Sequence, residues 1–252
     1  MKKLVKSLFP AQVRWLQSRR LMWRHYRVTG EYELRELPRY VRRNAVSVDV
    51  GGNIGVYTFH LGRLSRKVIT FEPNPDYVSQ IKALGVRNGE IEQVALSEQA
   101  GEAELRIPAL EGGEAPGMAS LSEMAVPDGA CLRTIHVRMA RLDDYSLSPV
   151  GFIKIDVEGF EESVLAGAME TIRRERPNLL IEIEERHNPG GLERIRQRLA
   201  DLNYKGYFFL DGSQRPIAEF DLARHQDPAN LQDAAFHNRR ALPYINNFLF
   251  VA

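Results

Sequence analysis

A glycine-rich turn beside an acid is the segment of this sequence whose residue types most clearly predict chemistry. The run VDVGGNIG at residues 48–55 is an apolar, strand-like stretch that breaks into glycines and then opens a helical pattern. Glycine is needed where the backbone adopts unusual dihedral angles or approaches a ligand closely. A helix N-terminus there offers unpaired N–H groups to an anionic group. The run therefore predicts a small-molecule site at the end of a strand.

A second acid, Glu72, follows the apolar run at residues 67–71, about twenty residues after the glycines. A carboxylate at the end of this second strand can accept hydrogen bonds from both ribose hydroxyls of a nucleoside cofactor. The turn and the acid together are typical of enzymes that bind either a dinucleotide or S-adenosylmethionine.

Asp49 favours the second of these cofactors. It lies two residues before the first glycine, where the strand of a dinucleotide dehydrogenase is usually apolar. A buried carboxylate costs several kcal/mol unless it is paired, and the ammonium group of S-adenosylmethionine would be such a partner. Gly51 and Gly55, with Asn53 between them, also do not fit the pattern G-x-G-x-x-G. An NAD-dependent oxidoreductase of Rossmann type and a non-catalytic cofactor-binding module are the alternatives.

Charged residues alternate along two further apolar runs. Lys154 and Asp156 share one face of the first run, and Glu182 and Glu184 share one face of the second. A central parallel strand is covered on both sides, so Lys154 is predicted to form a buried ion pair with Glu182 or Glu184. Asp156 and Glu184 are predicted to project into the crevice beyond the strand ends, where ligands bind in such sheets.

If S-adenosylmethionine donates its methyl group to a hydroxyl, that hydroxyl has to lose its proton, either to a general base or by metal-assisted ionisation. His187 directly follows the run that holds Glu184, so it is the best base candidate, with an exposed loop histidine as the alternative. His237, in a late polar stretch, is a candidate contact for an anionic acceptor. Asp156 and Glu184 have oxygen ligands that suit Mg²⁺, but two carboxylates without a third fixed ligand do not favour a metal.

The elements that would position these residues follow one another as strands and helices in alternation, which predicts an α/β fold with a mostly parallel sheet. We expect strands at residues 45–50, 67–71, 91–95, 152–155 and 179–183, closed by a pair at 207–210 and 247–251. Helices are expected at 55–64, 75–84, 161–168 with a further turn to 174, and 192–202. The segments 97–145 and 211–243 interrupt the alternation and are predicted to be substrate-side insertions.

Residues 1–43 form a basic arm ahead of the main domain at 44–252. The arm holds twelve Lys or Arg residues and three Glu residues, a net charge of +9, and the rest of the chain carries about −8. We predict a helical cap that packs on the domain; contact with a membrane surface, an anionic carrier or nucleic acid is the alternative. A single cysteine, no long apolar run and no signal-peptide pattern favour a cytoplasmic protein, with peripheral membrane contact through the arm as the alternative.

At this point the sequence resembles the FkbM-type methyltransferase family. Seven segments match in the family's order: DVGGNIGVYT (49–58), FEPNP (71–75), VALSEQAGEAEL (94–105), LDDY (142–145), IKIDVEGFEESVLAGA (153–168), RPNLLIEIEE (176–185) and NFLFV (247–251). Gly52 departs from the family, which more often has alanine there. The resemblance implies a Rossmann-like class I methyltransferase fold, S-adenosylmethionine as donor, and transfer to oxygen on a sugar, a glycan or a natural product.

The resemblance also implies roles for individual residues. It assigns Asp49, Gly51, Asn53 and Gly55 to the methionine moiety of the cofactor, with Gly52 and Thr58 in the same motif, Glu72 to the ribose, Ala95 and Leu96 to the adenine, and Asp156 to the methyl group and acceptor. Nucleic acid is not expected as the acceptor. The NPDY segment at 74–77 is similar to the motif of amino-methylating DNA enzymes, but it follows the second strand rather than the fourth.

Overall fold

The computed structural model describes residues 18–26, 31–110, 113–114, 131–230 and 244–252. Several sequence predictions therefore lie outside the described residues. These are the predictions for residues 1–17 and 27–30 of the basic arm, for 111–112 and 115–130 of the first insertion, and for 231–243, which include His237.

An eight-stranded sheet forms the centre of the molecule, with the strand order β11-β10-β12-β9-β8-β1-β2-β3. The strands are β1 Val46–Val50, β2 Lys67–Phe71, β3 Gly89–Glu92, β8 Val150–Ile155, β9 Asn178–Glu182, β10 Lys205–Leu210, β11 Ser213–Pro216 and β12 Asn247–Val251. From β3 to β9 all neighbours are parallel, whereas β12 runs antiparallel to both β9 and β10. This confirms the predicted parallel sheet with its closing strands; β11 is an edge strand that the sequence did not predict.

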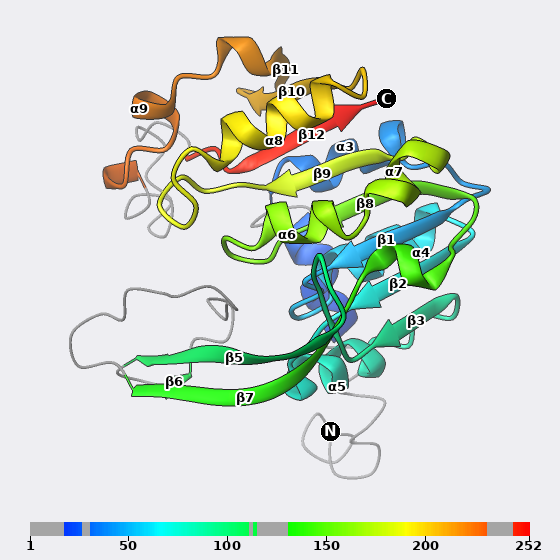
Figure 1. Ribbon diagram of the computed structural model, residues 1–252. Helices are drawn as coiled ribbons and strands as arrows, with labels where there is room; N and C mark the ends of the chain where they lie inside the picture. Colours follow the sequence, from blue (N-terminus) through cyan, green and yellow to red (C-terminus); the bar gives the residue numbers. More distant parts are fainter. Residues whose placement is uncertain (1–17, 27–30, 111–112, 115–130, 231–243) are drawn as a thin grey trace, which may run out of the picture.

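Helices cover both faces of this sheet (Figure 1). The α-helices are α3 Glu33–Tyr40, α4 Val56–Leu64, α5 Pro75–Ala83, α6 Glu161–Ala166, α7 Met169–Glu175, α8 Gly191–Ala200 and α9 Leu222–His225, with short 3₁₀ turns at Leu142–Tyr145 and Ile217–Glu219. Strand alternation decides what each face buries. Val46, Val48 and Val50 pack with residues of α6, α7 and α8, so Ser47 and Asp49 point to the face that α3 and α4 cover.

A second, four-stranded sheet has the order β4-β7-β5-β6. Its strands are β4 Ala95–Leu96, β5 Gly101–Leu110, β6 Gly113–Glu114 and β7 Cys131–Ala140. The strand predicted at 91–95 is wrong at its end, because β3 ends at Glu92 and Ala95 belongs to β4. The Val94 N–H donates to the Glu92 carbonyl at 3.0 Å, and this tight turn sends β4 to pair with β7 instead of β2. The β5–β7 hairpin projects on the side where the parallel strands end (Figure 1).

The described part of the basic arm packs on α4. Residues 18–26 are helical, and Met22 within them is 1% exposed. The Trp23 ring contacts Phe59 and His60 of α4 edge-on, with centroids 6.1 and 5.6 Å apart. Leu34 of α3 is buried in the cluster that contains residues of α4. These contacts dock the described part of the arm on the domain; its role as a cap stays a prediction, as does contact with a membrane or an anionic carrier. No helix among the described residues is long and apolar enough to cross a membrane.

This packing predicts a difference between two neighbouring residues. Met22→Ala is expected to lower the free energy of unfolding by about 2–5 kcal/mol, because it leaves a cavity beneath the helix. Leu21 is 43% exposed, so Leu21→Ala is the matched control and should leave the melting temperature close to that of the wild type. Thermal unfolding of both variants measures the effect; equal melting temperatures would contradict the docking of residues 18–26.

Candidate active site

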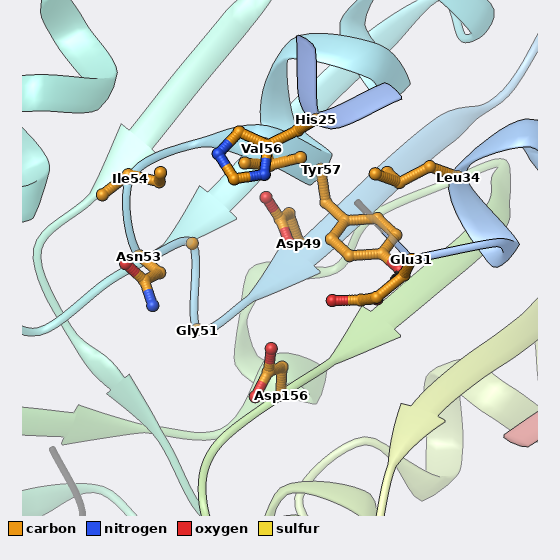
Figure 2. Close-up of a pocket in the computed structure, with 11 residues that line it drawn as sticks. His25, Glu31, Leu34, Asp49, Gly51, Asn53, Ile54, Val56, Tyr57 and Asp156 are labelled. Atoms are coloured by element: carbon orange, nitrogen blue, oxygen red, sulfur yellow. Dashed lines mark hydrogen bonds between the residues drawn. The ribbon is translucent and has the colours of Figure 1, made fainter. Parts of the chain in front are cut away.

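A pocket of about 210 Å³ lies where β1 and β8 end (Figure 2). The glycine turn after β1, the first turn of α4 and the basic arm form its walls. The lining residues are His25, Glu31, Leu34, Asp49, Gly51, Gly52, Asn53, Ile54, Val56, Tyr57 and Asp156. Five of the predicted cofactor residues thus share one pocket with six residues that the sequence analysis did not assign to the site.

The glycine turn is packed too closely for side chains. Gly51 has a φ of +81°, and a Cβ there would lie 1.8 Å from the carbonyl oxygen of Asp156. Glycine at this position therefore allows β1 to end directly against the end of β8. A Cβ on Gly52 would lie 2.4 Å from the Thr70 methyl carbon. The Thr70 methyl group thus occupies the space that an alanine side chain at position 52 would need, which accounts for the glycine there.

Asp49 is a buried carboxylate with one unsatisfied oxygen. Its side chain is 1% exposed, and Oδ2 accepts a hydrogen bond of 2.6 Å from the Thr58 hydroxyl. Oδ1 has no hydrogen-bond partner among the described residues. Burial raises the pKa of Asp49 to about 6, although the Thr58 hydrogen bond and Lys154 oppose the shift. A cationic group in the pocket would satisfy Oδ1 and favour the charged carboxylate, so the site fits an ammonium group.

Glu72 is held by the backbone on both sides. Its Oε2 accepts from the Asn53 N–H and its Oε1 from the Asn74 N–H, each at 2.8 Å. Burial raises the pKa of Glu72 to about 7. Each carboxylate oxygen keeps a further lone pair, so Glu72 can still accept from ribose hydroxyls. The Asn53 hydrogen bond also fixes the position of Glu72 relative to the glycine turn.

Asp156 and Lys154 meet at the end of β8. Lys154 is fully buried, and its Nζ lies 3.8 Å from both Asp156 Oδ2 and Glu182 Oε2. The predicted ion pair with Glu182 is therefore confirmed. Burial lowers the pKa of Lys154, but the nearby carboxylates, Asp156 first, outweigh it and hold this pKa above its usual value. Asp156 is 28% exposed and lines the pocket, so the same aspartate faces both the buried lysine and the site.

Glu184 and His187 belong to a separate cluster at the end of β9. The His187 Nε2 lies 3.3 Å from Glu158 Oε2 and 3.8 Å from Glu184 Oε2. Burial lowers the pKa of His187 and raises that of Glu158 to about 8. Burial also raises the pKa of Glu184, but hydrogen bonds, first from Arg186, bring it below its usual value. Among the described residues neither Glu184 nor His187 lines the pocket, and their acid–base roles stay predictions.

The remaining predicted residues occupy other positions. Thr58 supports Asp49 from α4, and Gly55 begins that helix with a φ of +88°. Ala95 and Leu96 are buried in β4, and their contact with adenine stays a prediction. In the part of the chain that the structure describes, no group of three or more His, Cys, Asp or Glu residues is placed to hold a metal ion.

The sequence analysis missed six of the pocket residues, namely His25, Glu31, Leu34, Ile54, Val56 and Tyr57. Three of them belong to the arm, which was interpreted as a cap without a role in the site. One signal was present in the sequence: the only acidic residues of the basic arm are three glutamates at positions 31, 33 and 36. An acid in a strongly basic segment indicates a specific contact rather than a solvated charged face.

Comparisons with known proteins define first the class and then the family. A methyltransferase FkbM from Methylobacillus flagellatus KT superposes with a TM-score of 0.51 at 16% identity, over 83% of this chain and 44% of that one. This likeness shows the Rossmann-like class I methyltransferase fold. The model of the methyltransferase FkbM domain matches residues 49–206, so the chain belongs to the FkbM methyltransferase family. It spans less than half the length of the Methylobacillus protein.

Two other similar structures carry different names. A SAM-dependent O-methyltransferase from Thermotoga maritima has a TM-score of 0.45 and 10% identity, over 89% of this chain and 67% of that one. An rRNA methylase from Streptococcus thermophilus has a TM-score of 0.44 and 14% identity, over 86% and 91%. No curated protein sequence matches this chain.

The raised pKa of Asp49 predicts how stability depends on pH without cofactor. The folded protein holds the proton on Asp49 up to about pH 6, against a usual value of 3.8. The protonated Asp49 carboxyl therefore contributes to stability fully below about pH 4, and this contribution is lost as the pH rises through about 6. Asp49→Asn cannot ionise, so it should gain roughly 1–3 kcal/mol over the wild type across this window.

Denaturant unfolding at several pH values measures this gain. Asp201→Asn, at the exposed end of α8, is the control and should follow the wild type. A constant difference between Asp49→Asn and the wild type at all pH values would show that the pKa of Asp49 is the same in the folded and the unfolded protein.

Proposed function

We propose that this protein transfers a methyl group from S-adenosylmethionine to a hydroxyl of a sugar, glycan or natural-product acceptor. The observation that carries the proposal is that Asp49 lines the pocket while its buried Oδ1 has no hydrogen-bond partner among the described residues. A dinucleotide has no ammonium group to place there. Membership of the FkbM family supports the same donor. The NAD-dependent oxidoreductase is the alternative that the first experiment below tests.

Asp49 in the pocket and Glu72 at the end of β2 would hold the donor by its two ends. Asp49 would bind the ammonium group, and Glu72, fixed by the Asn53 and Asn74 N–H groups, would bind the ribose. When bound, the donor supplies a methyl group on a positively charged sulfur. A drug-sized ligand needs roughly 300–1,000 Å³, so the pocket of about 210 Å³ is the right size for part of the donor. Its lining residues indicate the methionine end.

Asp156 would orient the acceptor or the transferring methyl group from the end of β8. Much of the acceleration in such a transfer comes from alignment and from exclusion of water. The acceptor proton needs a base, and His187 with Glu184 remains the proposed pair. Their cluster lies after β9, next along the sheet from β8. Mg²⁺ is not part of the proposal, although carboxylates of this kind suit it.

The acceptor class rests on the family rather than on the pocket. The β5–β7 hairpin projects on the side where the parallel strands end (Figure 1), and we propose that it forms a wall for the acceptor, together with residues 211–243.

The cytoplasmic location, with membrane or anionic-carrier contact through the arm, is likewise part of the proposal. A screen of sugars, glycans and natural-product alcohols, scored by release of S-adenosylhomocysteine, is the direct approach to the acceptor.

Cofactor binding is the first test. Calorimetry should show S-adenosylmethionine or S-adenosylhomocysteine binding at micromolar levels, because Asp49 and Glu72 together provide several charge-assisted hydrogen bonds. NADH should show no binding under the same conditions. Tight NADH binding without S-adenosylhomocysteine binding would assign the protein to the oxidoreductases.

Asp156→Asn tests the catalytic part of the proposal, once the screen has supplied an acceptor. The variant keeps the shape of the side chain but removes its charge, so turnover should fall by about a hundredfold or more. Cofactor affinity should stay within a few-fold of the wild type, since Asp49 and Glu72 are untouched. Asp201→Asn, at the exposed end of α8, is the control. A variant with a lower melting temperature but normal turnover would show that Asp156 only stabilises the fold, by pairing with Lys154, and has no role in the transfer.

A further inference from the structure

The wall of the pocket opposite the glycine turn comes from the basic arm and the first turn of α4. Figure 2 shows Glu31, Leu34 and Tyr57 on one side and Gly51 with Asn53 on the other. The inference that follows concerns Glu31 and rests on the proposed donor. Glu31 lies outside the segment that the family model matches.

Glu31 is held in place by two donors from distant parts of the chain. Its Oε2 accepts hydrogen bonds from the Tyr57 hydroxyl of α4 and from the Asn247 amide of β12, the latter at 3.1 Å. Its Oε1 receives no hydrogen bond from the residues that the structure describes. One oxygen thus fixes the side chain, which lines the pocket, and the other is available to a ligand.

The orientation of the Asn247 amide is set by charge. Its Oδ1 accepts from the Lys154 ammonium at 3.0 Å, and its Nδ2 therefore faces the Glu31 carboxylate. The ring of Tyr57 covers the same ammonium, with Lys154 Nζ 5.0 Å from its centroid. The buried lysine thereby orders both of the groups that hold Glu31.

The pocket has more negative than positive groups. Glu31, Asp49 and Asp156 all line it, and the buried cation beside them, Lys154, is shared between Asp156 and Glu182. Independently, Asp49 lines this pocket, and its buried Oδ1 has no hydrogen-bond partner among the described residues. An ammonium group has three donors, more than a single carboxylate oxygen uses. A cationic ligand group would therefore find acceptors on two walls at once.

We propose that Glu31 is a cofactor-binding residue, which with Asp49 forms a two-carboxylate seat for the ammonium group of S-adenosylmethionine. Tyr57, which also lines the pocket, and Asn247 are positioning residues, because their hydrogen bonds fix Glu31. The basic arm is then part of the cofactor site. The amino-acid end of the cofactor is held between the turn after β1 and the residues just before α3.

Glu31→Gln is the variant that tests this seat, with S-adenosylhomocysteine and 5′-methylthioadenosine as the two probes. The amide oxygen can still accept from Tyr57 and Asn247, but an NH₂ group replaces the free oxygen. Affinity for S-adenosylhomocysteine should fall about tenfold or more. Affinity for 5′-methylthioadenosine, which lacks the amino-acid end, should not change. Glu36→Gln, on the same segment but paired with Arg39, is the control and should leave both affinities unchanged.

The results separate this inference from the proposed donor. If the wild type does not bind S-adenosylhomocysteine, the proposed function fails. If the wild type and Glu31→Gln bind S-adenosylhomocysteine equally well, only the two-carboxylate seat is wrong. The seat is also overturned if Glu31→Gln loses affinity equally for S-adenosylhomocysteine and for 5′-methylthioadenosine. Tyr57→Phe keeps the charge of Glu31 but removes one hydrogen-bond donor to it. Affinity for S-adenosylhomocysteine should therefore fall by about threefold. Unchanged binding by Tyr57→Phe would show that Tyr57 does not position Glu31. If Glu31→Gln does not fold, unchanged binding by Tyr57→Phe would also overturn the proposed seat.

Discussion

The buried ammonium group of Lys154 is the constraint on which the rest of the site depends. Taking an unpaired ammonium out of water costs several kcal/mol, and this one is fully buried in the middle of the sheet. It is compensated by Asn247 at 3.0 Å, by two carboxylates at 3.8 Å and by the ring of Tyr57. These groups come from β12, β9, α4 and the end of β8 itself. The closing strand and the first helix after the glycine turn are therefore tied to one charge.

That arrangement leaves an excess of buried acid on the side of the pocket. Burial raises the pKa of Asp49 to about 6 and of Glu72 to about 7, and it raises that of Glu182 as well. Such groups lower the stability of the free protein at neutral pH, because the fold keeps them from water without pairing them fully. Strain of this kind is common where a site is prepared for a ligand of opposite charge. The glycine turn and the acids thus form a preorganised site rather than a packed strand end.

The sequence predicted the central sheet because its information is local there. Apolar runs, the glycine turn and the acids at strand ends can each be recognised within a few residues. The basic arm is different, because the contacts of Glu31 join it to residues 26 and 216 positions away, and no local pattern reports such a pair. The break between β3 and β4 was missed for a related reason. Ala95 is apolar and continues the strand pattern, and only its pairing with β7 shows that it has left the sheet.

Gly52 shows how a departure from the family pattern follows from its surroundings. The Thr58 hydroxyl donates to Asp49, so the 3.0 Å contact between the Thr58 and Thr70 hydroxyls is one in which Thr70 donates. This chain of two hydroxyls orients the satisfied oxygen of Asp49, while the other oxygen has no partner among the described residues. The Thr70 methyl then points to residue 52, where a Cβ would approach it to 2.4 Å. Glycine at 52 and threonine at 70 are therefore a matched pair, and an alanine introduced at 52 alone would disturb the hydroxyl chain that holds Asp49.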